Sequence, residues 1–217
     1  MNKVLKKLEQ FGIVPVVVLE DAKDAALLAK ALCDGGLACA EVTFRTAAAE
    51  ESIRIMSQKF PEMVVGAGTV LTVEQVDRAV KAGAQFIVSP GFNPVVVKYC
   101  IDHEIPITPG VVTPSEMEQA IAMGLEVVKF FPAEPSGGLG MIKAVAAPYT
   151  TLKFMPTGGI NPENIVPYLQ YDKILACGGS WMVKGNLVAE GTADELKNSV
   201  NATSFEDAFV KIAEEGK

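Results

Sequence analysis

Eight short runs of β-branched and other apolar residues recur along this chain at nearly even spacing, and this rhythm limits the folds that the chain can adopt. Each run ends in a Pro, Gly or polar residue, and a segment with helical periodicity follows it. The ends of successive runs lie roughly 19 to 26 residues apart, which is the length of one strand plus one helix. The chain is therefore predicted to consist of repeated βα units. The runs are residues 13–19, 38–44, 63–69, 85–91, 105–110, 127–133, 152–159 and 173–179.

The segments between the runs begin with residues that cap helices. Thr72 and Thr113 are each followed three residues later by Gln or Glu, which is the spacing of a capping box. Asn93, Thr113 and Asn161 each precede a proline, which is favoured at the first helical position. These signals predict helix starts after four of the runs. Glycines such as Gly83 predict where helices end.

Eight βα units whose strands are apolar on both sides favour a closed parallel (β/α)₈ barrel. An open Rossmann-like sheet is the alternative, but no G-x-G-x-x-G motif follows the first run, where the chain reads LEDA at residues 19–22. We expect one barrel domain over residues 1–217, with an N-terminal helix at 1–12 and a closing loop and helices at 185–217. A barrel this small has short loops and suits a small-molecule site.

Composition excludes several classes of protein. The net charge of −7 argues against binding to nucleic acid, which requires a basic surface. A single histidine, His103, leaves no donor set for a His-rich metal site. The four cysteines form no C-x-x-C pair and lie among apolar residues, as buried thiols of a reducing compartment do. We expect a cytoplasmic protein without signal peptide, membrane span, metal or cofactor.

Lys129 interrupts the apolar pattern of the sixth run. Strand alternation places Val127, Lys129 and Phe131 on one face. In a barrel, reactive groups project from the C-terminal ends of strands, and apolar surroundings favour the neutral amine, which can attack a carbonyl. The alternative is a lysine that reaches the rim or pairs with a carboxylate. The pattern favours a catalytic lysine.

The second run carries Glu41 and Arg45 on one face. One interpretation is an ion pair between these two side chains. The other is catalysis, with Glu41 as an acid/base group and Arg45 as a fork for a substrate carboxylate. Arg45 is one of three arginines in the chain, and it alone stands at a predicted strand end. Both interpretations remain open from the sequence.

Paired glycines end the last two runs. Gly158 and Gly159 follow the seventh strand, and Gly178 and Gly179 precede Ser180 after the eighth. The last two βα loops of a barrel often hold phosphate through backbone N–H groups, although tight turns also use glycine. Two adjacent loops of this kind predict an anion site. Thr69 and Pro90, at the ends of the third and fourth strands, are expected to line the barrel mouth.

Several motifs together resemble those of the bacterial 2-keto-3-deoxy-6-phosphogluconate (KDPG) and 4-hydroxy-2-oxoglutarate (KHG) aldolase family. The similarity extends from about residue 3 through the eighth run, and the longest motifs surround Glu41 and Lys129. The motifs are GLACAEVTFR at 36–45, GAGTV at 66–70, SPG at 89–91, KFFPA at 129–133, PTGGI at 156–160 and GGSW at 178–181.

The resemblance implies a metal-independent class I aldolase, a lyase of the Entner–Doudoroff route that forms a homotrimer. It would cleave KDPG to pyruvate and D-glyceraldehyde 3-phosphate, and KHG to pyruvate and glyoxylate. By this resemblance Lys129 would form the Schiff base and Glu41 would be the general acid/base. The other roles would be carboxylate binding by Arg45 and Thr69, phosphate binding by Gly158, Gly159, Gly179 and Ser180, and pocket lining by Pro90, Phe131 and Thr157.

The first run departs from the family. Members often carry a basic residue near the end of this strand, where the chain has Leu19, Glu20 and Asp21. This departure concerns contacts to the distal end of the substrate and leaves the reacting centre intact. The alternative functions are a phosphosugar isomerase or epimerase that uses Glu41 as its base, a non-catalytic barrel that binds a phosphorylated ligand and, more weakly, a metal-dependent aldolase.

Overall fold

The computed structural model describes residues 1–183, of which 1–182 form one compact unit. All eight predicted strands are present, as is the predicted N-terminal helix α1 (Lys3–Phe11). The predicted closing loop and helices at 185–217 lie outside the described residues. The strands are β1 (Ile13–Val17), β2 (Cys39–Thr43), β3 (Val64–Gly68), β4 (Ile87–Ser89), β5 (Ile107–Val111), β6 (Val127–Phe130), β7 (Lys153–Pro156) and β8 (Cys177–Gly179).

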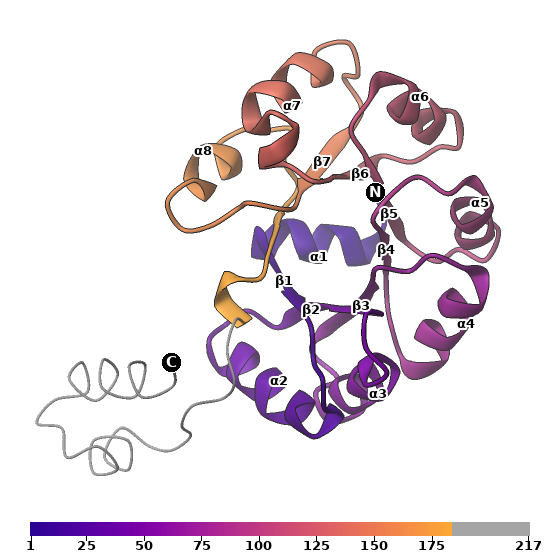
Figure 1. Ribbon diagram of the computed structural model, residues 1–217, viewed down its shortest axis with the longest axis vertical. Helices are drawn as coiled ribbons and strands as arrows, with labels where there is room; N and C mark the ends of the chain where they lie inside the picture. Colours follow the sequence, from indigo (N-terminus) through magenta and orange to yellow (C-terminus); the bar gives the residue numbers. More distant parts are fainter. Residues whose placement is uncertain (184–217) are drawn as a thin grey trace, which may run out of the picture. The chain divides into compact units, whose positions relative to one another are not determined.

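Helices connect the strands on the outside of the sheet (Figure 1). Among residues 1–183, no helix is long and apolar enough to cross a membrane. The α-helices after α1 are α2 (Ala25–Asp34), α3 (Ala49–Lys59), α4 (Val73–Ala82), α5 (Pro94–Asp102), α6 (Pro114–Ala122), α7 (Gly138–Ala146) and α8 (Ile165–Leu169). Three short 3₁₀ helices are η1 (Ala22–Asp24), η2 (Glu134–Ser136) and η3 (Trp181–Val183).

The strands form one parallel sheet that closes on itself. The paired order is β7-β6-β5-β4-β3-β2-β1-β8. Parallel bridges between Phe154 and Ile174 and between Thr157 and Gly178 join the two ends of this order. The chain is thus a (β/α)₈ barrel, as predicted, and the open Rossmann-like alternative is wrong.

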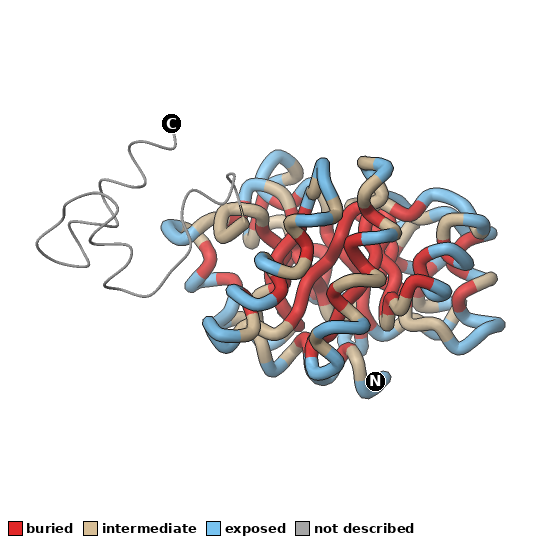
Figure 2. Tube along the Cα trace, turned by 90° about the horizontal axis from the view of Figure 1, so that it is seen from below, coloured by how far each residue is buried: buried red, intermediate tan, exposed pale blue. Residues whose placement is uncertain are grey.

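Alternate residues of β6 and β7 enter two different cores. The outer core lies between sheet and helices and includes Val128 and Phe130 of β6. The inner core fills the barrel and includes Val127 of the same strand. Figure 2 shows the strands buried behind helices whose outward residues are exposed. Since Lys129 shares a face with Val127, it points into the barrel.

Helix α1 covers the N-terminal end of the barrel (Figure 1). Leu5 and Leu8 of this helix belong to the inner core with Val127. Gly12 ends α1 with φ +69°, a left-handed conformation that favours glycine, and its carbonyl accepts the Cys177 N–H at 2.8 Å. The turn that ends α1 is thereby bound to β8, and this end of the barrel is closed by apolar side chains.

Two predicted caps begin their helices as expected. Asn93 caps α5, and Thr113 begins α6 with a capping box in which the Glu116 carboxylate accepts the Thr113 N–H at 2.8 Å. Thr72 caps α4, but the Gln75 side chain accepts the N–H of residue 71 in place of the Thr72 N–H, so the predicted box is only half formed.

The helix predicted to start at Asn161 is the exception. The Asn161 side chain accepts the N–H groups of Glu163 and Asn164, and this local turn delays the start of α8 to Ile165. The capping signal is present, but it caps a turn and not the helix.

The cysteines behave as core residues. Cys39, Cys100 and Cys177 are buried and Cys33 is half-buried, all as free thiols. Burial raises the pKa of Cys39, Cys100 and Cys177 to about 12, so these thiols stay protonated at neutral pH.

Candidate active site

Lys129 and Glu41 project into the barrel from strands that are far apart in the sequence. Lys129 lies opposite Gly110 of β5 and Met155 of β7. Glu41 lies opposite Gly66 of β3. Gly66 leaves room for the Phe86 ring, since a Cβ there would lie 2.3 Å from this ring.

These two side chains form an ion pair inside the barrel. The Lys129 Nζ donates to Glu41 Oε1 at 3.3 Å, with 6% and 1% of the two side chains exposed. The second carboxylate oxygen, Oε2, is buried and has no partner among the described residues. A buried ion pair is weak evidence for stability, because desolvation offsets the attraction. A buried amine beside a half-satisfied carboxylate is instead suited to proton transfer.

The pairing decides between two interpretations of Glu41. Its partner is Lys129, not Arg45, so the ion pair within β2 considered from the sequence is wrong. Lys129 does pair with a carboxylate, as the alternative interpretation of this lysine proposed. This pairing does not exclude a catalytic role, because both side chains face the interior of the barrel.

Gly68 makes room for the Glu41 carboxylate. A Cβ at this position would lie 2.2 Å from Glu41 Oε1. Sequence reasoning passed over this glycine, although a glycine inside a strand often marks a close approach of another group. Any larger residue here would displace the carboxylate.

Arg45 and Thr69 meet at the ends of β2 and β3. The Arg45 Nε donates to Thr69 Oγ1 at 3.2 Å, and Arg45 is exposed. Thr69 has φ +56°, a conformation unusual for a residue other than glycine. The bond uses Nε, and the terminal nitrogens of the guanidinium have no partner within residues 1–183. This fork fits a carboxylate.

Phe131 connects the amine to the glycine-rich loop. Its ring centroid lies 5.2 Å from Lys129 Nζ, and a Cβ on Gly158 would lie 3.4 Å from the edge of the same ring. Pro90 approaches from β4, because a Cβ on Gly110 would lie 2.1 Å from the Pro90 carbonyl oxygen. The predicted lining residues Phe131 and Pro90 therefore lie around the Lys129 side of the barrel.

The two glycine pairs are neighbours in space. The bridge from Thr157 to Gly178 brings the loops after β7 and β8 together. Gly158 and Gly159 have φ +98° and +85°, which side chains rarely allow. A Cβ on Gly178 would lie 2.3 Å from the buried hydroxyl of Thr157. Ser180 follows Gly179 and is half-buried.

Other side chains singled out in the sequence stay outside this group. His103 ends α5, where its Nδ1 lies 2.8 Å from the Tyr99 carbonyl oxygen, as expected for a helix-terminal residue. Trp181 packs against the outer core. After β1, Asp21 pairs with Lys23 at 2.8 Å, and both side chains are exposed.

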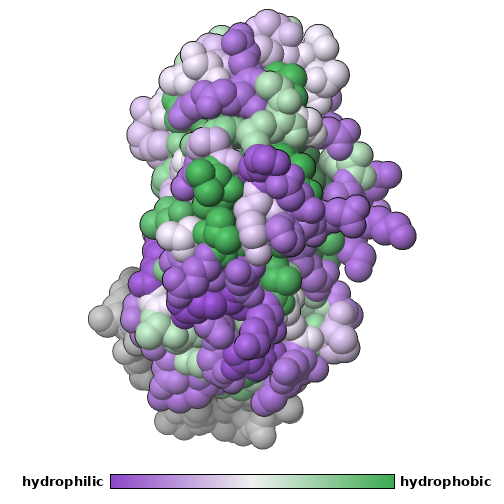
Figure 3. All heavy atoms as spheres, turned by 90° about the vertical axis from the view of Figure 1, so that its right-hand side faces the viewer, coloured by the Kyte–Doolittle hydropathy of each residue, from purple (hydrophilic) through white to green (hydrophobic). Residues whose placement is uncertain are grey.

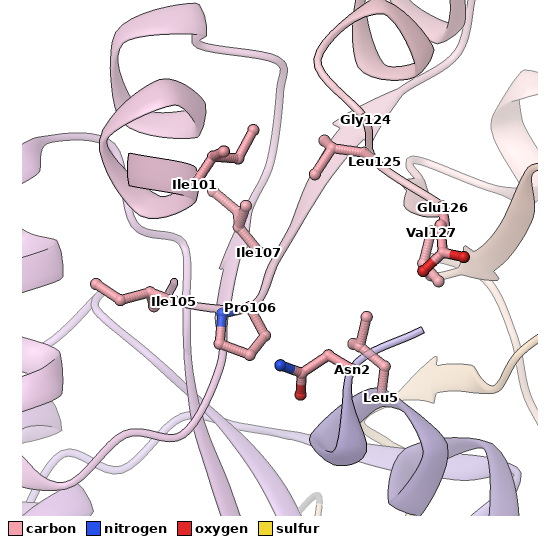
Figure 4. Close-up of a pocket in the computed structure, with 10 residues that line it drawn as sticks. All are labelled: Asn2, Leu5, Ile101, Ile105, Pro106, Ile107, Gly124, Leu125, Glu126 and Val127. Carbon is pink, nitrogen blue, oxygen red and sulfur yellow. The ribbon is translucent and has the colours of Figure 1, made fainter. Parts of the chain in front are cut away.

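A hollow opens at the opposite end of the barrel, beside α1 (Figure 4). The ionisable residue in its lining, Glu126, pairs with the amino group of Met1 at 2.8 Å. The remainder is almost wholly apolar, so this hollow offers no reacting pair comparable to Lys129 and Glu41. The lining residues are Asn2, Leu5, Ile101, Ile105, Pro106, Ile107, Gly124, Leu125, Glu126 and Val127.

The chain is similar to proteins of known activity over most of its length. The family model for KDPG and KHG aldolase matches residues 4–199, which include the whole candidate site. The 2-dehydro-3-deoxy-phosphogluconate aldolase of Treponema pallidum is 51% identical over 196 residues, which are 90% of this chain and 93% of that protein.

Solved structures agree with this similarity. The crystal structure of the 2-keto-3-deoxy-6-phosphogluconate aldolase of Zymomonas mobilis ZM4 with 3-phosphoglycerate has a TM-score of 0.81 at 40% identity, and covers 84% of this chain and 87% of that one. The KDPG aldolase of Legionella pneumophila, with pyruvate captured as a covalent carbinolamine intermediate, has a TM-score of 0.80 at 34% identity, and covers 96% and 97%.

Proposed function

The chain belongs to the KDPG and KHG aldolase family, and from this premise we propose that it is a class I aldolase. It cleaves 2-keto-3-deoxy-6-phosphogluconate to pyruvate and D-glyceraldehyde 3-phosphate, and it acts on 4-hydroxy-2-oxoglutarate to give pyruvate and glyoxylate. The observation that carries this proposal is the buried Lys129–Glu41 pair inside the barrel.

Lys129 supplies the nucleophile. Its neutral amine attacks the C2 carbonyl of a 2-keto-4-hydroxy acid and forms a carbinolamine. Glu41 gives a proton to the departing hydroxyl, water leaves, and an iminium joins Lys129 to C2. The iminium withdraws electrons from the C3–C4 bond and so prepares this bond for cleavage.

Glu41 completes the proton transfers. As the C3–C4 bond breaks, its carboxylate accepts the proton of the C4 hydroxyl, directly or through water, and the aldehyde product forms. The electron pair of the broken bond becomes an enamine on the Lys129 adduct. Protonation of C3 and addition of water then release pyruvate and restore the amine. The unpartnered Oε2 gives Glu41 an acceptor for this proton.

Three groups of residues hold the substrate. Arg45 and Thr69 bind the keto-acid carboxylate, and Pro90, Phe131 and Thr157 line the pocket. The backbone of Gly158, Gly159 and Gly179, with the Ser180 hydroxyl, binds the phosphate. An acidic protein can bind this anionic substrate because the guanidinium, the iminium and the loop amides make the local field positive.

We further propose a cytoplasmic homotrimer on the Entner–Doudoroff route. Exposed apolar side chains support association: Leu71 and Val95 are 51% and 67% exposed, near the starts of α4 and α5. Figure 3 shows hydrophobic side chains gathered in the middle of this side of the molecule. Native mass spectrometry tests the proposal, since Val95→Glu should shift the mass from three chains to one.

Turnover tests the proposed activity. Purified protein is mixed with KDPG, and pyruvate is followed by coupled reduction to lactate; the same assay with KHG tests the shorter substrate. Release of pyruvate that persists in excess chelator supports a metal-independent aldolase. Folded protein that interconverts phosphosugars without releasing pyruvate would support an isomerase or epimerase, and binding without turnover would support a non-catalytic barrel.

A further inference from the structure

The loop after β7 has its carbonyl groups anchored from one side by the turn after β6. The Ala133 N–H donates to the Thr157 carbonyl at 2.8 Å, and the Glu134 N–H donates to the Gly158 carbonyl at 3.0 Å. The Glu134 side chain packs against the next residue, because a Cβ on Gly159 would lie 2.6 Å from Glu134 Cβ. Two βα loops are thus tied together by backbone bonds.

Asn164 anchors the third carbonyl of this loop. Its Nδ2 donates to the Gly159 carbonyl at 2.9 Å, and its Oδ1 accepts the Asn161 N–H at 2.9 Å. Asn164 is half-buried and lies directly before α8. The Asn161 Nδ2 also donates to the Gly159 carbonyl, at a longer distance of 3.5 Å, so Asn164 is the shorter of two side-chain anchors on the second glycine.

Anchored carbonyls determine where the N–H groups point. In a planar trans peptide the C=O of one residue and the N–H of the next point in opposite directions. Fixing the carbonyls of Thr157, Gly158 and Gly159 therefore turns the N–H groups of Gly158, Gly159 and Ile160 to the other side. The Thr157 N–H bonds to the Phe130 carbonyl, so the parallel bridge between Thr157 and Gly178 directs the Gly158 N–H at the Gly178 carbonyl. Within residues 1–183, the N–H groups of Gly159 and Ile160 have no hydrogen-bond partner. These two N–H groups are free donors at the proposed phosphate site.

A tyrosine holds the Glu134 carboxylate in a fixed place. Tyr168 of α8, which is buried, donates its hydroxyl to Glu134 Oε1. Burial, and next the neighbouring Glu134, raise the pKa of Tyr168, so the phenol remains a donor. A Cβ on Gly138 would lie within 3.0 Å of both side-chain oxygens, so glycine leaves room for this bond.

We propose that Asn164 and Glu134 are positioning residues that hold the loop after β7 with the N–H groups of Gly159 and Ile160 directed at the phosphate monoester of the substrate. This inference rests on the proposed function, which puts phosphate at this loop. Without an anchor both glycines sample many backbone conformations. Binding of an anion must then order the loop, and this entropic cost weakens the binding. Neither residue contacts the reacting atoms, so the effect should be confined to phosphorylated ligands.

Asn164→Ala tests the proposal through binding of glycerol 3-phosphate, which carries the phosphate but cannot undergo the reaction. Isothermal titration calorimetry should give a Kd about tenfold weaker than wild type, as expected for loss of one ordering hydrogen bond at an anion site. Asn93→Ala is the matched control. Asn93 also caps and cross-links a βα loop, by accepting the Val95 N–H and donating to the Leu71 carbonyl. Its Kd should stay within about twofold of wild type.

Borohydride trapping of pyruvate and the thermal midpoint provide readouts that a merely structural role would move. Both should be unchanged in Asn164→Ala. An unchanged Kd, a parallel fall in trapping or midpoint, an equal loss in Asn93→Ala, or no glycerol 3-phosphate binding by wild type would each overturn the inference. Failure of wild type to trap pyruvate, with the contrast in Kd intact, would contradict the proposed aldolase and leave the anion loop standing.

Discussion

Two lysine–glutamate ion pairs in the same barrel differ in their exposure to solvent and in their position along the barrel. Lys129 and Glu41 meet inside the barrel with 6% and 1% of their side chains exposed. Lys153, the first residue of β7, pairs with Glu9 of α1 at the N-terminal end, with 35% and 34% exposed. Lys129 and Lys153 lie on the neighbouring strands β6 and β7, yet one side chain is buried and the other is partly exposed.

The difference shows how burial changes what a lysine can do. Water screens the Lys153–Glu9 pair, which serves at most to fasten α1 to the barrel. Because the Lys129 amine and the Glu41 carboxylate are buried, bulk water does not screen them, and they can act together on a bound substrate. The surroundings agree: Glu41 and Thr157 each leave a buried oxygen without a partner among the described residues, whereas apolar side chains from α1 and the strands meet at the other end.

The largest expected effect is that of Lys129→Met. This change removes the amine and keeps the apolar stem, so turnover of KDPG should fall by about 10⁴-fold or more. The matched change at the other pair, Lys153→Met, should leave kcat within about twofold of wild type. The coupled pyruvate assay measures both, and far-ultraviolet circular dichroism checks folding. Equal losses in the two variants would remove the distinction between the pairs.

Glu41→Gln should lower kcat by about 10²- to 10⁴-fold, because the amide still accepts a bond from Lys129 but cannot carry a proton. Pyruvate should still form a trappable adduct in this variant, more slowly than in wild type. Single-turnover kinetics separate adduct formation from cleavage. A wild-type rate would make Glu41 a structural partner of Lys129 only.

Leu8→Ala tests the closed end of the barrel. Leu8 is fully buried in the inner core, so its truncation should lower the free energy of unfolding by about 2 to 5 kcal/mol. Urea denaturation measures this change. At temperatures where the variant is folded, kcat should match wild type, and a loss of kcat without a loss of stability would contradict the division between the two ends.

Arg45→Ala should raise the KM for KDPG by about 10- to 100-fold, the effect of losing a charge-assisted bond to the substrate carboxylate. Because Arg45 is exposed and bonds only Thr69 among the described residues, its thermal midpoint should barely move. Steady-state kinetics measures the change in KM, and calorimetry measures the thermal midpoint. A large fall in midpoint at constant KM would favour a structural role.

The smallest expected effect is that of Glu9→Gln. Half-exposed ion pairs contribute about 0 to 1 kcal/mol, and salt reduces this further. Urea titrations at low and high salt should therefore differ little between wild type and variant, with the difference vanishing at high salt. A loss of several kcal/mol would mean that this pair is not the weak counterpart of Lys129 and Glu41.

The sequence predicted the barrel because its signal is periodic: eight apolar runs at nearly constant spacing leave few folds to choose from. Alternation within each strand also grouped Lys129 with Val127, and Glu41 with Thr43, on one face of the strand. It could not identify their pairing, since the two residues are 88 positions apart and only closure of the sheet brings them together. Space for Glu41 at Gly68 depends on the same closure.

Asn161 and Asn164 show a second limit. The Asn-Pro signal at residues 161–162 predicted a helix start, but asparagine caps turns as readily as helices, and the helix begins at Ile165. The role of Asn164 depends on where a backbone carbonyl of the glycine loop points. The direction of a backbone carbonyl cannot be predicted from a pattern of residue types, so the bond from Asn164 to Gly159 could not be predicted from the sequence.

The most direct test of the central claim is borohydride reduction of the full chain in the presence of pyruvate, followed by peptide mass mapping. We expect a reduced pyruvyl adduct on Lys129 and none on Lys153, which lies on the neighbouring strand β7, is partly exposed and serves as an internal control. Folded protein that carries no adduct, or carries it on Lys153 and other exposed lysines to the same extent, would contradict the claim that burial beside Glu41 makes Lys129 the nucleophile.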